Sequence, residues 1–96
     1  MSAYFVFNYS ITDAEGYSSY PGAAMPSIGE SGAEVLVADY ATDPVEGEPG
    51  TVTVVLKFES KDAARAWYDS PSYQSALPTR RANSTGIAVV CDGLGA

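Results

Sequence analysis

The fold of this chain is decided by residues 51–69, TVTVVLKFESKDAARAWYD, in which a strand pattern passes directly into a helix pattern. Apolar residues first recur at every second position, as they do on one face of a β-strand. They are Val52, Val54, Leu56 and Phe58, and the other face holds Thr51, Thr53, Val55 and Lys57. Ser60 is a suitable N-cap for a helix over 61–69. Its packing side consists of Ala63, Ala64, Trp67 and Tyr68.

Upstream, residues 3–11 and 33–40 have the apolar and aromatic composition of two more strands. Between them, Thr12 and Glu15 form a capping box, which predicts a helix that begins at residue 13. Pro21 predicts a kink or break. A second helical stretch then covers about 23–30, with Pro26 near its start, and Gly32 is a suitable stop.

Downstream, Ser70 and Pro71 have the residue types of an N-cap and first helical position, which predicts a short helix through about Leu77. Pro78 predicts a stop or kink there. Residues 86–92 read as the last strand and 93–96 as a tail. Residues 41–50 are rich in Pro, Gly and acidic side chains, and this composition predicts a surface loop.

The resulting order is β-α-β-β-α-β within one domain covering residues 1–96. This order indicates an α+β, ferredoxin-like split βαβ fold, with a four-stranded antiparallel sheet and both helices on one face. Right-handed crossovers place the first and third strands at the centre. The opposite face, with Val6, Val55 and Val90 or its neighbours, carries few charges and predicts an interface. Two sheets packed face to face would give a homodimeric α/β barrel.

The charge pattern excludes several classes of protein. The net charge is −7, and residues 1–56 hold eight acidic and no basic side chains. We therefore expect no nucleic-acid or membrane partner, because both need a basic surface. Histidine is absent and Cys91 is the single cysteine, so we expect no catalytic His, no disulfide and no metal or other cofactor. This cysteine usage fits a cytoplasmic location, and Cys91 itself is interpreted as buried.

Asn8 and Lys57 are the first candidate site residues. Alternation places both on the more polar faces of the two central strands. If those faces line a barrel between subunits, an amide and an ammonium there would bind a carboxylate or enolate. In the alternative interpretation, Lys57 lies at a strand end and extends its ammonium group to water.

Aromatic residues supply the second set of candidates. Trp67, Tyr68 and Tyr73 surround the predicted helix start at residue 70, and Arg80 follows, which predicts a cleft for an aromatic or anionic compound. Tyr20, with Tyr17 on the same helix face, adds a pocket hydroxyl. The alternative for all of these side chains is core packing with hydroxyls bonded at the rim. The acidic loop residues Asp39, Asp43, Glu46 and Glu48 are interpreted as solvated, because their spacing does not match a calcium loop.

Several motifs resemble those of the domain of unknown function 1330 family, in the dimeric α/β-barrel group of ferredoxin-like proteins. The resemblance covers nearly the whole chain and is most specific at residues 58–74. It rests on Phe58-Glu59-Ser60, Ala63-Ala64, Trp67-Tyr68, Ser70-Pro71-Ser72-Tyr73-Gln74, Thr12-Asp13 with Tyr17 and Tyr20, and Arg80 with Ser84. Ser72 replaces a common Glu, and Ala38-Asp39-Tyr40 replaces an Arg-Gly-Gly-like turn, which removes a positive charge.

Three functions follow as hypotheses. The first is a homodimer that binds a small organic molecule in a barrel or cleft pocket. The second, implied by the wider group, is a cofactor-independent enzyme of monooxygenase, isomerase or dehydratase type, acting on a small organic acid or aromatic compound. Its proton transfer would need Asp, Glu, Lys or Tyr, because histidine is absent. The third is a purely structural or interaction dimer.

Overall fold

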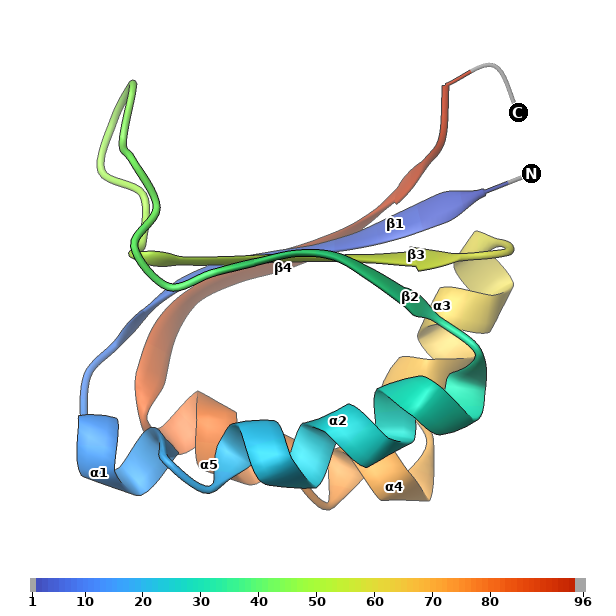
Figure 1. Ribbon diagram of the computed structural model, residues 1–96, viewed down its shortest axis with the longest axis horizontal. Coiled ribbons are helices and arrows are strands. Elements are labelled where there is room, and N and C mark those ends of the chain that lie inside the picture. The colour runs from blue at the N-terminus through green and yellow to red at the C-terminus, as the bar shows by residue number, and fades with distance from the viewer. Residues whose placement is uncertain (1, 95–96) are drawn as a thin grey trace.

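Four strands pair into one antiparallel sheet in the order β2-β3-β1-β4 in the computed structural model, which describes residues 2–94. Helices cover one face of this sheet (Figure 1). Along the chain the elements are β1 (Ala3–Ile11), α1 (Ala14–Tyr17), α2 (Tyr20–Ser31), β2 (Glu34–Asp39), β3 (Val52–Phe58), α3 (Lys61–Tyr68), α4 (Pro71–Gln74), α5 (Leu77–Ala82) and β4 (Ser84–Asp92). The ferredoxin-like α+β fold is therefore confirmed, with β1 and β3 at the centre.

The core lies between the sheet and the helices, and it is rich in aromatic rings. Alternate residues of β1 point into it, namely Phe5, Phe7 and Tyr9, and β3 contributes Val52, Leu56 and Phe58. Trp67 on α3 packs edge-on against Phe5, with ring centroids 5.4 Å apart. Full burial of one such side chain contributes about 1.5–3 kcal/mol. The period-2 pattern therefore predicted the core face of β3 correctly, and β1 alternates in the same way.

The first helical region differs from the prediction in where it begins and breaks. Asp13, not Thr12, is the N-cap of α1, and its carboxylate accepts a hydrogen bond from the Gly16 amide at 3.1 Å. The Thr12 amide instead donates to the Asn83 carbonyl at 2.8 Å. The break falls between α1 and α2, before Pro21, which occupies the first turn of α2 where no intrahelical amide partner is needed. Pro26 lies inside α2 and not near its start.

Gly32 ends α2 with a φ of 77°, a left-handed conformation that glycine adopts without strain. Ser60 and Ser70 are N-caps, as predicted, and each hydroxyl accepts a backbone amide hydrogen bond from the residue three positions later. The helix expected to run from Pro71 through about Leu77 ends at Gln74, and Pro78, predicted to stop or kink it, lies in the first turn of α5. The last strand begins at Ser84, two residues earlier than predicted.

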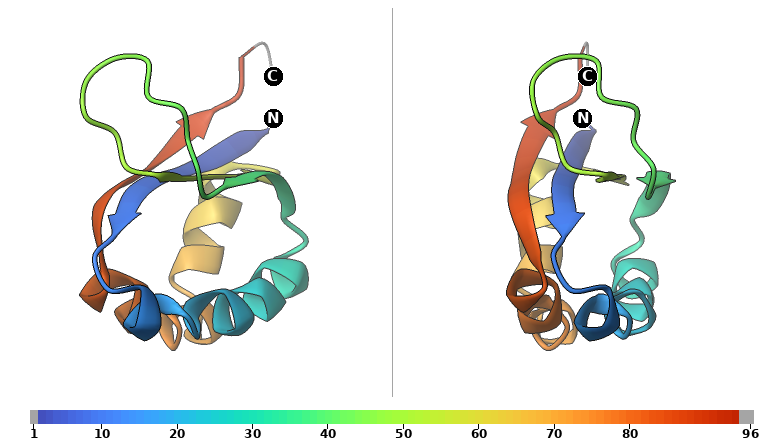
Figure 2. Two further views of the ribbon diagram at one scale, coloured as in Figure 1. Left: turned by 60° about the vertical axis from the view of Figure 1, so that its left-hand side comes forward. Right: turned by 90° about the vertical axis from the view of Figure 1, so that its left-hand side faces the viewer.

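The opposite face of the sheet carries no helix within residues 2–94 (Figure 2). It presents Val6 and Val55, as expected, while β4 contributes Ile87, Val89 and Cys91. Val90 instead pairs with Phe5 and packs on the helix side. The prediction that Cys91 is buried is wrong for a single subunit, because Cys91 alternates with Val90 and is exposed. The segment 40–51 rises on this open side of the sheet (Figure 2).

Candidate functional site

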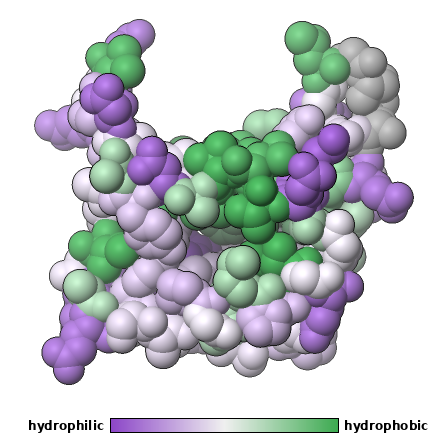
Figure 3. Space-filling model, in the orientation of Figure 1, coloured by the Kyte–Doolittle hydropathy of each residue, from purple (hydrophilic) through white to green (hydrophobic). Residues whose placement is uncertain are grey.

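A small cavity of about 70 Å³ lies between α2 and the sheet, under strands β2 and β3. We call it the tyrosine cavity. Its lining is Phe7, Tyr9, Tyr20, Pro21, Ala24, Met25, Ile28, Val35, Ala38, Tyr40, Val54, Leu56 and Trp67. Of the lining residues, Met25 and Tyr40 are about half exposed. Figure 3 shows a recess at this place, beneath the hydrophobic patch along β2.

Tyrosine hydroxyls form two hydrogen-bonded groups around the cavity. Tyr17 is the centre of the first, with hydroxyl oxygens 2.6 Å from that of Tyr9 and 3.0 Å from that of Tyr40. Tyr20 and Tyr73 form the second, at 2.7 Å. Five phenol hydrogens are present and three serve these hydroxyl pairs, so two remain within residues 2–94 to be donated elsewhere.

Burial raises the pKa of Tyr9, Tyr17 and Tyr20 above the usual value of a phenol, because a phenolate loses its hydration in the core. These groups are therefore neutral at physiological pH. A neutral phenol donates a hydrogen bond well but is a poor base. The tyrosines can hold an oxygen atom of a ligand, including one that carries negative charge.

Arg80 lies beside this network, and only 8% of it is exposed. Its Nε donates to the Tyr73 hydroxyl at 3.3 Å. The guanidinium carbon lies 5.1 Å from the centre of the Phe7 ring and 5.5 Å from that of Tyr9, within the range of cation–π attraction. Arg80 can therefore polarise the Tyr73–Tyr20 pair, which ends at the cavity wall.

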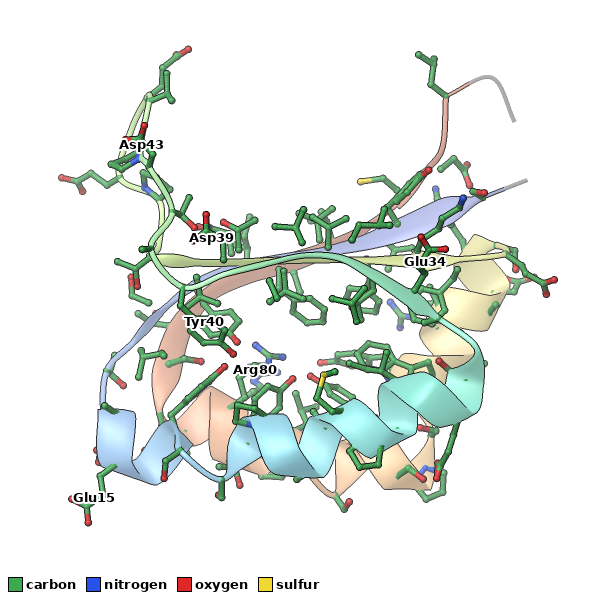
Figure 4. All side chains as sticks on the ribbon, in the orientation of Figure 1. Glu15, Glu34, Asp39, Tyr40, Asp43 and Arg80 are labelled. Carbon is green, nitrogen blue, oxygen red and sulfur yellow. The ribbon has the colours of Figure 1, made fainter. Side chains whose placement is uncertain are left out.

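A second hollow lies under β4, on the other side of Phe7. We call it the β4 groove. It has a volume of about 330 Å³ and is lined by Tyr68, Arg80, Arg81, Ser84, Thr85, Gly86, Ile87 and Ala88. Figure 4 shows Arg80 and Tyr40 on the helix side of the sheet, between the two layers. Arg80 therefore separates an apolar cavity from a polar groove.

Four of the seven candidate residues converge on a fifth, Tyr73, which is fully buried. Its ring centroid lies 4.2 Å from that of Trp67 and 5.5 Å from that of Tyr68. Its hydroxyl forms a hydrogen bond with the Tyr20 hydroxyl and accepts another from the Nε of Arg80. The structure thus brings the aromatic set and Arg80 together. Tyr73 lines neither the tyrosine cavity nor the β4 groove. It therefore acts as a positioning residue for Tyr20 and Arg80.

Asn8 and Lys57 lie apart from this cluster, on the open face of the sheet. They also lie apart from each other, since Asn8 pairs with Thr53 and Lys57 pairs with Tyr4 near the other end. The Asn8 side chain accepts a hydrogen bond from the Gly50 amide at 2.7 Å and donates to the Thr53 hydroxyl at 3.0 Å. Asn8 therefore fastens the end of the 40–51 segment to β1. A pocket formed by Asn8 and Lys57 between subunits stays a prediction.

Sequence reasoning missed Tyr9, Tyr40 and Met25 as cavity residues. Tyr9 could have been found from the sequence, because among Phe5, Phe7, Tyr9 and Ile11, which alternate on one face of β1, it alone carries a polar group. Tyr40 and Met25 could not have been found in this way. They reach the cavity only because β2 and α2 meet at one edge of the core.

A split βαβ order, with one antiparallel sheet and its helices on one face, defines a ferredoxin-like α+β protein. Within this class, the chain belongs to the family described as Domain of unknown function (DUF1330), which it matches over residues 2–94. A comparison with curated proteins found no match. Within residues 2–94, every helix is too short or too polar to cross a membrane.

Solved structures show the same fold at low sequence identity. A protein of unknown function from Rhodopseudomonas palustris is 14% identical, with a TM-score of 0.76 over 99% of this chain and 84% of that one. SnoaB, a cofactor-independent oxygenase from Streptomyces nogalater, is 11% identical, with a TM-score of 0.71 over 99% and 95%. A dimeric protein of unknown function with a ferredoxin-like fold from Bacteroides fragilis is 9% identical, with a TM-score of 0.62 over 96% of both chains.

Proposed function

We propose that this protein is a homodimer that binds a small organic molecule in the tyrosine cavity. The observation that carries the proposal is an apolar cavity lined by Tyr9, Tyr20 and Tyr40, whose hydroxyls belong to two hydrogen-bonded groups with two phenol hydrogens left to donate. The walls favour an apolar or aromatic body. The hydroxyls favour a carbonyl, phenolate or carboxylate oxygen at one end of that body.

The size of the cavity limits the ligand. About 70 Å³ is far below the roughly 300 Å³ of an ordinary ligand pocket. A ligand as large as one aromatic ring therefore has to displace side chains at the opening. Met25 is suited to this, because it is half exposed and its unbranched side chain has several rotamers of similar energy.

Fluorescence of Trp67 tests the cavity directly, since Trp67 is the single tryptophan and lines it. We expect a saturable change on titration with benzoate or phenol. Ala38→Leu places a larger side chain in the cavity from β2 and should abolish the change. Ala88→Leu makes the same substitution on β4 outside the cavity and should leave the fluorescence change as large as in wild type. A response of equal size in wild type and Ala38→Leu would overturn the proposal.

The dimer is proposed to form through the open face of the sheet. Leu36, Val37, Ile87 and Val89 on β2 and β4 are each 40% exposed or more, which is unusual for side chains of this type in a folded subunit. A second copy of the same face would cover them and would also bury Cys91. The mass of the native protein by light scattering tests this: about 20 kDa supports the dimer, and 10.0 kDa excludes it.

A cofactor-independent oxygenase is the second candidate function, and SnoaB, the structurally similar protein from Streptomyces nogalater, is such an enzyme. What favours it here is the group of neutral tyrosines, which could hold the oxyanion of an electron-rich phenol while O₂ acts as oxidant. Uptake of O₂ in the presence of such a phenol would support it. Binding of the phenol without O₂ uptake would support a binding protein. No binding of the phenol would support a purely structural or interaction dimer.

A further inference from the structure

Arg80 is a buried cation that no carboxylate of residues 2–94 accompanies. Within residues 2–94, the one ion pair joins Lys61 to Asp92 at the surface, at 3.5 Å. The chain has 12 acidic side chains, yet none of those in the described part lies within 4.0 Å of either Arg80 or Arg81. Figure 4 shows Glu15, Glu34, Asp39 and Asp43 at the periphery, away from Arg80. Burial of an unpaired charge is costly, so this arrangement calls for a physical reason.

The two terminal nitrogens of Arg80 are the groups left without partners. Nε donates to Tyr73, and neither Nη atom makes a hydrogen bond within residues 2–94. Every side-chain polar atom that is sealed from solvent in this part of the chain does have a partner. The Nη atoms must therefore reach solvent-accessible space. Arg80 lines the β4 groove but not the tyrosine cavity, which makes the groove that space.

The sequence of β4 creates the groove. Its residues on the helix side near Arg80 are Gly86, opposite Tyr9, and Ala88, opposite Phe7. The small side chain of Ala88 leaves the layer between β4 and α5 partly unfilled, whereas Gly86 is needed for close approach, because a Cβ there would clash with the backbone of β1. The guanidinium lies over the buried faces of the Phe7 and Tyr9 rings. Arg81, Ser84 and Thr85 then add a second cation and two hydroxyls to the lining.

We propose that the β4 groove binds the oxyanion group of a small molecule, a carboxylate or a phosphate. The planar fork of a guanidinium matches two oxygens of either group. Arg80 is already fixed by Tyr73 and by the rings beneath it, so it loses little side-chain freedom on binding. A volume of about 330 Å³ accommodates the anionic group with a small organic body beside Tyr68.

This site is independent of the proposed ligand of the tyrosine cavity. The two hollows share only the Arg80–Tyr73–Tyr20 hydrogen bonds between them. They can be blocked separately, because Ala38 lines the cavity and Ala88 lines the groove. Failure of one proposal therefore does not imply failure of the other.

Calorimetric titration of the full chain with inorganic phosphate and with acetate, at constant ionic strength against sodium chloride, tests the groove. We expect saturable binding of at least one of the two anions, and the stronger one identifies the class of ligand. Ala88→Leu should abolish binding while Ala38→Leu leaves it. Arg81→Gln should weaken it about tenfold, as loss of a charged hydrogen-bond donor does. Arg65→Gln, an exposed arginine on α3 outside this groove, should change it less than about twofold.

Three outcomes would overturn the proposal. The first is the absence of saturable binding for both anions. The second is unchanged binding in Ala88→Leu, and the third is equal weakening in Arg65→Gln and Arg81→Gln. Arg81, Ala88 and Arg65 are all exposed, so their variants are expected to fold, and circular dichroism checks this. Arg80→Lys keeps the charge but not the fork, and it should bind phosphate more weakly than wild type.

Discussion

Ala38 and Ala88 stand at the two ends of one row of paired residues across the sheet. Ala38 pairs with Val54, Val54 with Phe7, and Phe7 with Ala88. All four residues are on the helix side, and the two alanines are on the edge strands. Small side chains at both ends leave a hollow on each side of Phe7, one apolar and one polar. Both proposed sites therefore have the same structural origin.

Filling the hollow under β4 should not destabilise the fold. In Ala88→Leu the added methyl groups enter about 330 Å³ of open space, so no neighbour has to move. We expect the free energy of unfolding to stay equal or to rise by up to about 1 kcal/mol, from added apolar burial. Urea denaturation measures it. A loss of more than about 2 kcal/mol, typical of overpacking, would show that the groove is not open.

Tyr73→Phe should be costly although it removes one oxygen atom. The Arg80 Nε and the Tyr20 hydroxyl would both lose their partner in the core. Buried polar groups without partners cost about 1–3 kcal/mol, which urea denaturation detects. Tyr40→Phe removes a hydroxyl from a half-exposed side chain and serves as the control, with an expected loss under about 1 kcal/mol. Equal losses in the two variants would contradict the central position of Tyr73.

Asn8→Ala should release the 40–51 segment from the sheet. Its amide group bonds both the amide and the carbonyl of Gly50. We expect faster hydrogen exchange and faster proteolysis in residues 41–50, with a loss of about 1–2 kcal/mol in unfolding free energy. Ser10→Ala, two residues along the same face, is the matched control. Unchanged protection of the segment in Asn8→Ala would show that other contacts hold it.

Stability should fall at high pH. The pKa of Tyr9, Tyr17 and Tyr20 is raised by burial, so these phenols keep their protons in the folded chain at a pH where the unfolded chain has lost them. The folded state then binds more protons, and its stability is lost as the pH rises above about 10. Urea midpoints between neutral and alkaline pH measure this. Tyr20→Phe should reduce the slope, and a flat profile in wild type would contradict the burial of these hydroxyls.

Val89→Glu should dissociate the proposed dimer. Val89 is 45% exposed and pairs with Val6 in the middle of the open face, where a carboxylate would have to be buried against a second subunit. Light scattering should then give the monomer mass. Ala66→Glu, on the exposed side of α3, should keep the wild-type mass. Equal masses in both variants and wild type would place any contact between subunits elsewhere.

The residues of the candidate site differ in how well they could be predicted from the sequence. Trp67, Tyr68, Tyr73 and Arg80 were predicted as one cluster because they are near in sequence and surround a helix start, and local geometry then brought them together. Tyr20 joined them through a contact with Tyr73, 53 residues away. The sequence predicted a cleft beside Tyr68 and Arg80 but not the presence of two separate hollows, because a cavity depends on which side chains are missing from a layer, and that requires the strand pairing.

Local chemistry determined the elements of this protein. Alternation in β1 and β3 chose their buried faces, and Ser60, Ser70 and Gly32 set helix ends through backbone hydrogen bonds and φ preferences within a few residues. Tertiary structure alone decided what depends on distant partners. It brought the amides of Thr12 and Asp13 to the Asn83 carbonyl beside the start of α1, and it placed the Asn8 side chain against Gly50. It also left Arg80 between two hollows, because the row from Ala38 to Ala88 exists only once the strands have paired.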